Sequence, residues 1–157
     1  MGVIKKLIFL LIPIIGYSQF YKDIIEIESV NTFKKVVIEN NYQFSKEDGG
    51  WIFYGYELEE KDDEILAKKW GGYNIEDGSW YFQFYDKNNI AFDYGYEYYE
   101  ITDSIKENCK YFDIMEDEWG KEFVTYKCKD TKWGDLGMIG FNIINDSGVV
   151  KFLNFKD

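Results

Sequence analysis

Carboxylates are the most abundant side chains in this chain that can take part in acid–base chemistry. The 157 residues include 29 aspartates and glutamates, 18 basic residues that are all lysine, and no histidine. Without histidine there is no Ser-His-Asp or Cys-His relay and no imidazole ligand for zinc. Without arginine there is no bidentate group for phosphate, and a net charge of −11 repels nucleic acid. The composition therefore argues against these enzyme classes and against a nucleic-acid partner.

A pair of carboxylates is the arrangement for catalysis that remains, as in glycoside hydrolases. Such a pair must lie about 5–9.5 Å apart across a cleft. Asp93 and Glu97 share one face of a predicted strand, but four strand residues separate them by about 13 Å. We therefore expect a non-catalytic protein, with a carboxylate-only glycoside hydrolase as an alternative.

The acidic clusters do not have the pattern of a calcium loop. Residues 57–64 and Glu116-Asp117-Glu118 are dense in carboxylates. Neither contains the glycine of a D-x-[DN]-x-[DN]-G loop, in which a sharp turn lets alternate oxygens converge on the ion. We therefore expect no bound metal and no cofactor.

Aromatic residues make up 20% of the chain, with 5 Trp, 14 Tyr and 13 Phe. Tyrosine and tryptophan combine a large rigid contact area with a polar tip, which suits them to binding surfaces. The strand pattern predicts that five tyrosines lie on the face opposite the core: Tyr54, Tyr56, Tyr81, Tyr85 and Tyr99. We expect this aromatic face to bind a protein, with a glycan as the alternative ligand and simple burial as the structural alternative. The negative charge favours a basic protein partner.

The segment Met1–Ser18 has the features of a signal peptide. Two lysines precede an apolar run at Leu7–Ile15, and small residues occupy the −3 and −1 positions for cleavage after Ser18. The run is shorter than the about 20 residues that a membrane-spanning helix needs. The sequence therefore predicts a secreted or periplasmic protein without a stable membrane anchor, consisting of one domain over residues 19–157.

The chain contains two cysteines, Cys109 and Cys128. An even number of cysteines in an exported protein favours a disulfide, and their spacing is too wide for a redox-active CxxC motif. We predict a structural disulfide, with two buried free thiols as the alternative.

Alternating apolar residues predict most of the secondary structure. Strands are expected at Tyr42–Phe44, Trp51–Leu58, Trp80–Tyr85, Ile90–Tyr98, around Ile114, and at Phe123–Cys128, Leu136–Ile144 and Val149–Phe155. The strands at Trp80–Tyr85 and Ile90–Tyr98 are expected to pair as a hairpin. Trp70-Gly71-Gly72-Tyr73 is expected to be a loop.

Two helices are expected between the strands. Residues 30–40 have apolar side chains at helical spacing and an Asn-Asn stop. Residues 102–110 contain Ser104 and Glu107 at the spacing of a capping box. The charged residues 59–69 are expected to add at most a helical turn on the surface.

The order of these elements indicates two tandem units, each a helix followed by strands. Phe44 and Phe53 follow the first helix, and Ile114 and Phe123 follow the second at the same spacing of nine residues. The expected fold is α+β: a curved, mainly antiparallel sheet of seven to nine strands with two short helices on one side. An all-β sandwich or barrel is the alternative.

This layout is similar, in architecture, to small secreted enzyme inhibitors of the β-lactamase-inhibitor type. Four features favour a binding function over catalysis: the negative charge, the small size, the export signal and the absence of catalytic residue types. We expect protein–protein recognition of an inhibitor or immunity type, with a basic partner.

Overall fold

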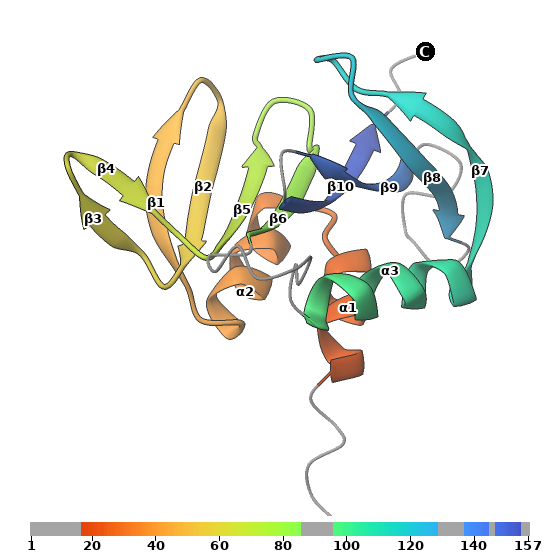
Figure 1. Ribbon diagram of the computed structural model, residues 1–157, viewed down its shortest axis with the longest axis horizontal. Helices are drawn as coiled ribbons and strands as arrows, with labels where there is room; N and C mark the ends of the chain where they lie inside the picture. Colours follow the sequence, from red (N-terminus) through yellow and green to blue (C-terminus); the bar gives the residue numbers. More distant parts are fainter. Residues whose placement is uncertain (1–16, 86–95, 129–136, 145–146, 155–157) are drawn as a thin grey trace, which may run out of the picture.

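Three helices lie on one side of an eight-stranded antiparallel sheet in the computed structural model (Figure 1). The structure describes residues 17–85, 96–128, 137–144 and 147–154. The helices are α1 Tyr17–Ile25, α2 Val30–Glu39 and α3 Tyr96–Asn108. The large sheet contains β1 Tyr42–Asp48, β2 Trp51–Tyr56, β5 Lys69–Asn74, β6 Trp80–Tyr85, β7 Cys109–Glu116, β8 Glu122–Cys128, β9 Gly137–Ile144 and β10 Ser147–Asn154. A separate hairpin consists of β3 Glu59–Lys61 and β4 Glu64–Leu66. The α+β fold with a curved antiparallel sheet is confirmed.

The strand order of the large sheet is β1-β2-β5-β6-β10-β9-β8-β7. Helix α2 therefore precedes the four strands of one half, and α3 precedes the four strands of the other half. The halves meet where β6 pairs antiparallel with β10. This arrangement confirms the tandem helix-plus-strands units.

The two halves share a β-bulge at equivalent places. The pairing of β1 with β2 shifts between Phe44 and Lys46, and the pairing of β7 with β8 shifts between Tyr111 and Asp113. In both β1 and β7, the fourth residue of the strand is skipped in the pairing. The third residues, Phe44 and Tyr111, are therefore equivalent. The equivalence with Ile114 that the sequence spacing suggested is wrong, because the β7–β8 turn is longer than the β1–β2 turn.

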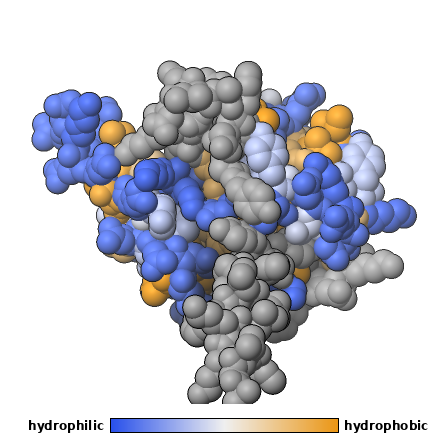
Figure 2. Space-filling model, turned by 60° about the horizontal axis from the view of Figure 1, so that its bottom comes forward, coloured by the Kyte–Doolittle hydropathy of each residue, from blue (hydrophilic) through white to orange (hydrophobic). Residues whose placement is uncertain are grey.

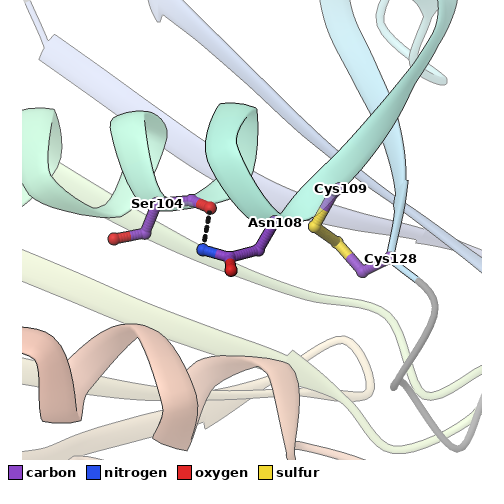
Figure 3. Close-up of a disulfide and its surroundings, with 4 residues drawn as sticks. All are labelled: Ser104, Asn108, Cys109 and Cys128. Carbon is purple, nitrogen blue, oxygen red and sulfur yellow. Dashed lines mark hydrogen bonds between the residues drawn. A yellow bond between two sulfur atoms is a disulfide. The ribbon is translucent and has the colours of Figure 1, made fainter.

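The predicted disulfide joins the first residue of β7 to the last residue of β8. Cys109 and Cys128 are directly opposite each other, with Cα atoms 4.3 Å apart (Figure 3). At the equivalent place in the first half, Tyr42 is opposite Tyr56, with ring centroids 5.9 Å apart. A covalent link in one half therefore occupies the position of an aromatic contact in the other.

Helix α2 agrees with its prediction. Ser29 is the N-cap of a capping box: its hydroxyl accepts a hydrogen bond from the Thr32 backbone N–H, and the Thr32 hydroxyl accepts one from the Ser29 backbone N–H. Phe33 and Val37 are fully buried against the sheet. The Phe33 ring packs on that of Phe82, with centroids 6.0 Å apart, so α2 covers the centre of the first half.

Helix α3 is longer than predicted and replaces the end of a predicted strand. Residues 96–98 are helical, and both sides of β6 are occupied by β5 and β10, so the predicted hairpin between Trp80–Tyr85 and Ile90–Tyr98 is wrong. Residues 90–95 lie outside the described residues. Tyr98, Ile101 and Ile105 are buried on one face of the helix. Burial of this face favours a helix more strongly than the alternation of the preceding aromatic residues favours a strand.

Ser104 lies inside α3, so the predicted capping box at this residue is wrong. Its backbone carbonyl accepts a hydrogen bond from Asn108 Nδ2 at 2.8 Å, next to the disulfide (Figure 3). The amide of the last helical residue thus satisfies a carbonyl in the last turn.

Two further segments differ from the sequence predictions. Residues 59–66 form the β3–β4 hairpin instead of a helical turn, with Asp62 and Asp63 at positive φ in its turn. The predicted loop at residues 70–73 is part of β5. Glycine suits this strand because a Cβ at Gly72 would lie 2.4 Å from Tyr81 Cε1.

Helix α1 was not predicted. The predicted leader Met1–Ser18 lies outside the described residues, apart from the two residues that begin α1. Phe20, Ile24 and Ile27, which follow the predicted cleavage point, are buried in the core. Within the described ranges, no helix is long and apolar enough to cross a membrane.

Candidate functional site

The sheet has a second face, which α1, α2 and α3 do not cover and which we call the distal face. Side chains alternate along a strand, so residues paired across neighbouring strands share a face. One row across the distal face consists of Phe53, Gly72, Tyr81, Lys151, Gly140 and Thr125. The lysine lies in the middle of this row, between the two halves of the sheet.

Aromatic side chains from the first half cluster on the distal face. The Trp51 ring lies 6.3 Å from that of Phe53 and 5.6 Å from that of Tyr81, measured between centroids. The glycine at position 72 leaves room for the Tyr81 ring. All three aromatic side chains are half-buried, so the cluster is part of the surface.

A buried ion pair joins β10 to the β7–β8 turn. Lys151 Nζ lies 3.3 Å from Asp117 Oδ2 and 2.9 Å from Glu118 Oε2. The side chains of Lys151 and Asp117 are only 4% and 3% exposed, whereas that of Glu118 is 52% exposed. A buried ammonium group requires such partners because desolvation penalises an unpaired charge.

Asp117 also orders the backbone of the turn. Its Oδ1 accepts hydrogen bonds from the backbone N–H groups of Trp119 and Lys121, both at 2.9 Å. Gly120 has φ +69°, a conformation that favours glycine. Trp119 therefore lies on an ordered turn with its side chain 66% exposed, and Lys151 Nζ lies 4.5 Å from its ring centroid.

A groove of about 350 Å3 lies between the two halves at the end of the sheet that carries these turns. Its described lining is Trp51, Asn74, Asp77, Ser79, Glu118, Trp119, Lys151 and Phe152, and we call it the tryptophan groove. Asp77 Oδ1 accepts hydrogen bonds from the backbone N–H and the hydroxyl of Ser79, at 2.9 and 2.6 Å. Indole rings and carboxylates in one groove suit cations and planar polar groups.

The five tyrosines expected on one face lie in different places. Tyr54 and Tyr56 are on the helix side of the sheet, where Tyr54 is only 7% exposed. Tyr81 is on the distal face, and Tyr99 is 41% exposed on α3. Tyr85 ends β6, and its side chain lies outside the described residues. The structure therefore does not bring the five together, and of the four whose side chains are described, only Tyr81 belongs to the aromatic cluster of the distal face.

A second cavity, of about 190 Å3, lies on the helix side between α1, α3 and the sheet. Lys69 Nζ lies 2.6 Å from Glu97 Oε2 in its wall. The buried Tyr42 hydroxyl, in the same region, has no hydrogen-bond partner among the described residues. Burial, together with the nearby Glu97 carboxylate and Tyr56, raises the pKa of Tyr42 well above its ordinary value. Glu97 is thus on a helix instead of the predicted strand, and Asp93, with which the sequence analysis compared it, lies outside the described residues.

The sequence prediction missed Trp51, Trp119 and Lys151 as site residues. Trp119 is a large aromatic in an acidic turn, where it has no core to join. Lys151 is a single charge within the apolar strand Val149–Phe152, which indicates a buried ion pair. Both signals are visible in the sequence, but neither identifies the partner residue across the sheet.

Comparison of the chain with protein-family models, with curated proteins and with solved structures finds no match in any of the three.

Within the part of the chain that the structure describes, no group of three or more Asp, Glu or Cys residues could hold a metal ion. Where the helix side is visible in colour in Figure 2, most residues are hydrophilic and the apolar residues form separate patches. The exposed tryptophan and the groove therefore make the distal face the candidate binding site.

Proposed function

We propose that this chain is an exported, non-catalytic protein that recognises a basic protein partner through its distal face, as an inhibitor or immunity-type protein does. The observation that supports this function best is Trp119. Its side chain is 66% exposed, yet Asp117 and Lys151 order the turn that carries it. An indole that stays largely exposed contributes little hydrophobic stability to a monomer, whereas it gives a binding protein an anchor.

Tryptophan is effective as an anchor because it buries a large area at a small entropic cost. A Trp side chain can bury about 150–250 Å2, and anchors of this kind contribute about 2–4 kcal/mol or more to binding. The cluster of Trp51, Phe53 and Tyr81 supplies further contact area on the same face. Because the turn is ordered before binding, less conformational entropy is lost when the complex forms.

The charge of the chain indicates the kind of partner. The net charge of −11 attracts a basic surface and accelerates association at low ionic strength. Salt at physiological strength screens charges beyond about 8 Å, so the affinity of such a complex falls as salt rises.

The proposed location is the periplasm or the extracellular medium. The Cys109–Cys128 disulfide is compatible with this location, because disulfides persist in oxidising compartments. The leader predicted for Met1–Ser18 supports the same proposal.

Affinity capture tests this function. The protein is used as bait for envelope and secreted fractions of the host, at low and at moderate salt. We expect one stoichiometric basic protein that dissociates as salt rises. Failure to capture any protein in a salt-sensitive way would contradict the proposal.

Glycan binding is the second candidate, and the tryptophan groove favours it. Trp51 and Trp119 could stack on sugar rings, while Asn74 and Asp77 offer polar groups beside them. A glycan array distinguishes the candidates, because this function requires saturable binding to a neutral saccharide that is insensitive to salt.

A further inference from the structure

We propose that the tryptophan groove receives an arginine side chain of the partner. This inference rests on the proposed function and specifies the chemistry of the contact. It is carried by three features of the groove: its charge, its indole rings and its ordered walls.

The charge of the groove favours a cation. Asp77 and Glu118 line it, and among its described lining residues Lys151 has the opposite charge. Asp117 and Glu118 both contact the lysine, so its charge is already compensated inside the protein. Among the described residues of the groove and its wall, the carboxylates of Asp77, Asp117 and Glu118 outnumber the Lys151 ammonium group. Glu118 is 52% exposed, which leaves its carboxylate accessible to a second cation.

The indole rings favour a guanidinium over an ammonium group. A guanidinium is planar and less strongly hydrated than an ammonium, so it can stack on an aromatic face while its N–H groups bind carboxylates. Trp119 already has the Lys151 ammonium 4.5 Å from its ring centroid, so the ring accepts a cation in this structure. Its large exposed area leaves room for a second group from the partner.

The walls of the groove are ordered before binding. On one side, the β5–β6 turn is fixed by the hydrogen bond from Gly78 N to Asn74 O at 2.9 Å and by the Asp77–Ser79 contacts. On the other side, Asp117 fixes the β7–β8 turn. A volume of about 350 Å3 is at the lower end for ligand pockets, about 300–1,000 Å3, and it suits one side chain better than a peptide segment.

A titration with small probes tests the groove directly. The full chain is titrated with N-acetyl-arginine amide and with its neutral isostere N-acetyl-citrulline amide, while NMR follows the tryptophan indole N–H signals. We expect saturable shifts of the Trp51 and Trp119 signals, with binding of the arginine probe at least about tenfold tighter than that of the citrulline probe. Equal binding of both probes, or shifts confined to other tryptophans, would overturn the proposal.

Three variants complete the titration. Trp119→Ala should abolish saturable binding, and because this residue is exposed, the variant should keep the fold. Asp77→Asn keeps an oxygen that can accept from Ser79 but removes a charge, so it should weaken arginine binding about fivefold. Trp70→Phe changes a tryptophan outside the groove and should bind as the wild type does. Unchanged binding by both Trp119→Ala and Asp77→Asn would contradict the assignment.

The same variants separate this inference from the function on which it rests. If the wild type and Asp77→Asn capture a salt-sensitive partner equally well while Trp119→Ala captures it less, recognition through Trp119 stands and the arginine assignment fails. If the arginine probe binds but no protein is captured, the groove assignment stands and the proposed function fails. Preference of the groove for a neutral saccharide over the arginine probe would overturn the groove assignment and favour glycan binding.

Discussion

Lys151 and Asp117 are 34 residues apart in the chain, yet their charged groups meet at 3.3 Å with both side chains almost fully buried. This contact joins the centre of the distal face to the turn that carries Trp119. The ion pair therefore contributes both to the fold and to the position of the proposed anchor.

Replacing the lysine should leave the buried Asp117 carboxylate without its cationic partner. We expect Lys151→Met to lower the free energy of unfolding by about 3 kcal/mol, measured by urea denaturation. Lys35→Met removes an exposed lysine 4.0 Å from Glu39 and should cost less than about 0.5 kcal/mol. Adding Asp117→Asn to Lys151→Met should recover part of the loss, since the double variant buries no unpaired charge. Equal effects of Lys151→Met and Lys35→Met would contradict this account.

The disulfide should stabilise the second half of the sheet. Cys109 and Cys128 are 19 residues apart, and a loop of this size corresponds to about 3 kcal/mol in the chain-entropy model. We expect the double variant Cys109→Ser/Cys128→Ser to unfold at lower urea concentration by that amount. Addition of a reductant should destabilise the wild type but leave the double variant unchanged. A reductant that has no effect on the wild type would show that the thiols are not linked.

Ser29 and Ser45 provide a matched pair of serine variants, because only the first of these hydroxyls caps a helix. Ser29→Ala removes the N-cap of α2 and should cost about 1 kcal/mol in thermal or urea unfolding. The Ser45 hydroxyl is buried without a hydrogen-bond partner among the described residues, so Ser45→Ala should be neutral or stabilising. A larger loss for Ser45→Ala than for Ser29→Ala would show that the Ser45 hydroxyl has a partner in solution.

The buried Tyr42 hydroxyl predicts a pH effect. Its pKa is raised well above the ordinary value of 10.0, chiefly by burial, so the folded protein holds this proton more tightly than the unfolded chain does. The resulting stability is fully present below about pH 10 and is lost as the pH rises through the folded pKa. Between about pH 10 and 11, the wild type should lose up to about 1.4 kcal/mol more than Tyr42→Phe does. Tyr99→Phe, at an exposed position, should follow the wild type, and coincident curves for all three proteins would contradict the prediction.

Local pattern was sufficient for much of the fold. The helical spacing of Val30, Phe33 and Val37 placed α2, because its apolar face packs on the sheet as the pattern requires. The repeated order of helix and strands indicated the two halves. The alternation of aromatics before residue 98 was misleading, because Tyr98 belongs with Ile101 and Ile105 on one buried helical face.

Other features depend on contacts between distant residues. A glycine pair in β5 resembled a loop, because nothing in its own segment shows that the Tyr81 ring needs the space above Gly72. The face on which Tyr54 lies is decided by the position of α2. The tryptophan groove requires Trp51 and Trp119, which the sheet brings to one cavity although 68 positions separate them in the numbering. Sequence spacing alone does not contain that information.

The most direct test of the proposed function is the affinity of the captured partner for Trp119→Ala, measured by titration calorimetry beside the wild type and Trp70→Phe. We predict that Trp119→Ala weakens binding at least about thirtyfold, as expected for an anchor worth about 2 kcal/mol. Trp70→Phe should bind within about twofold of the wild type, and all affinities should fall as salt rises. A partner that binds Trp119→Ala as tightly as the wild type would contradict the account, because the exposed indole would then not be the anchor of the complex.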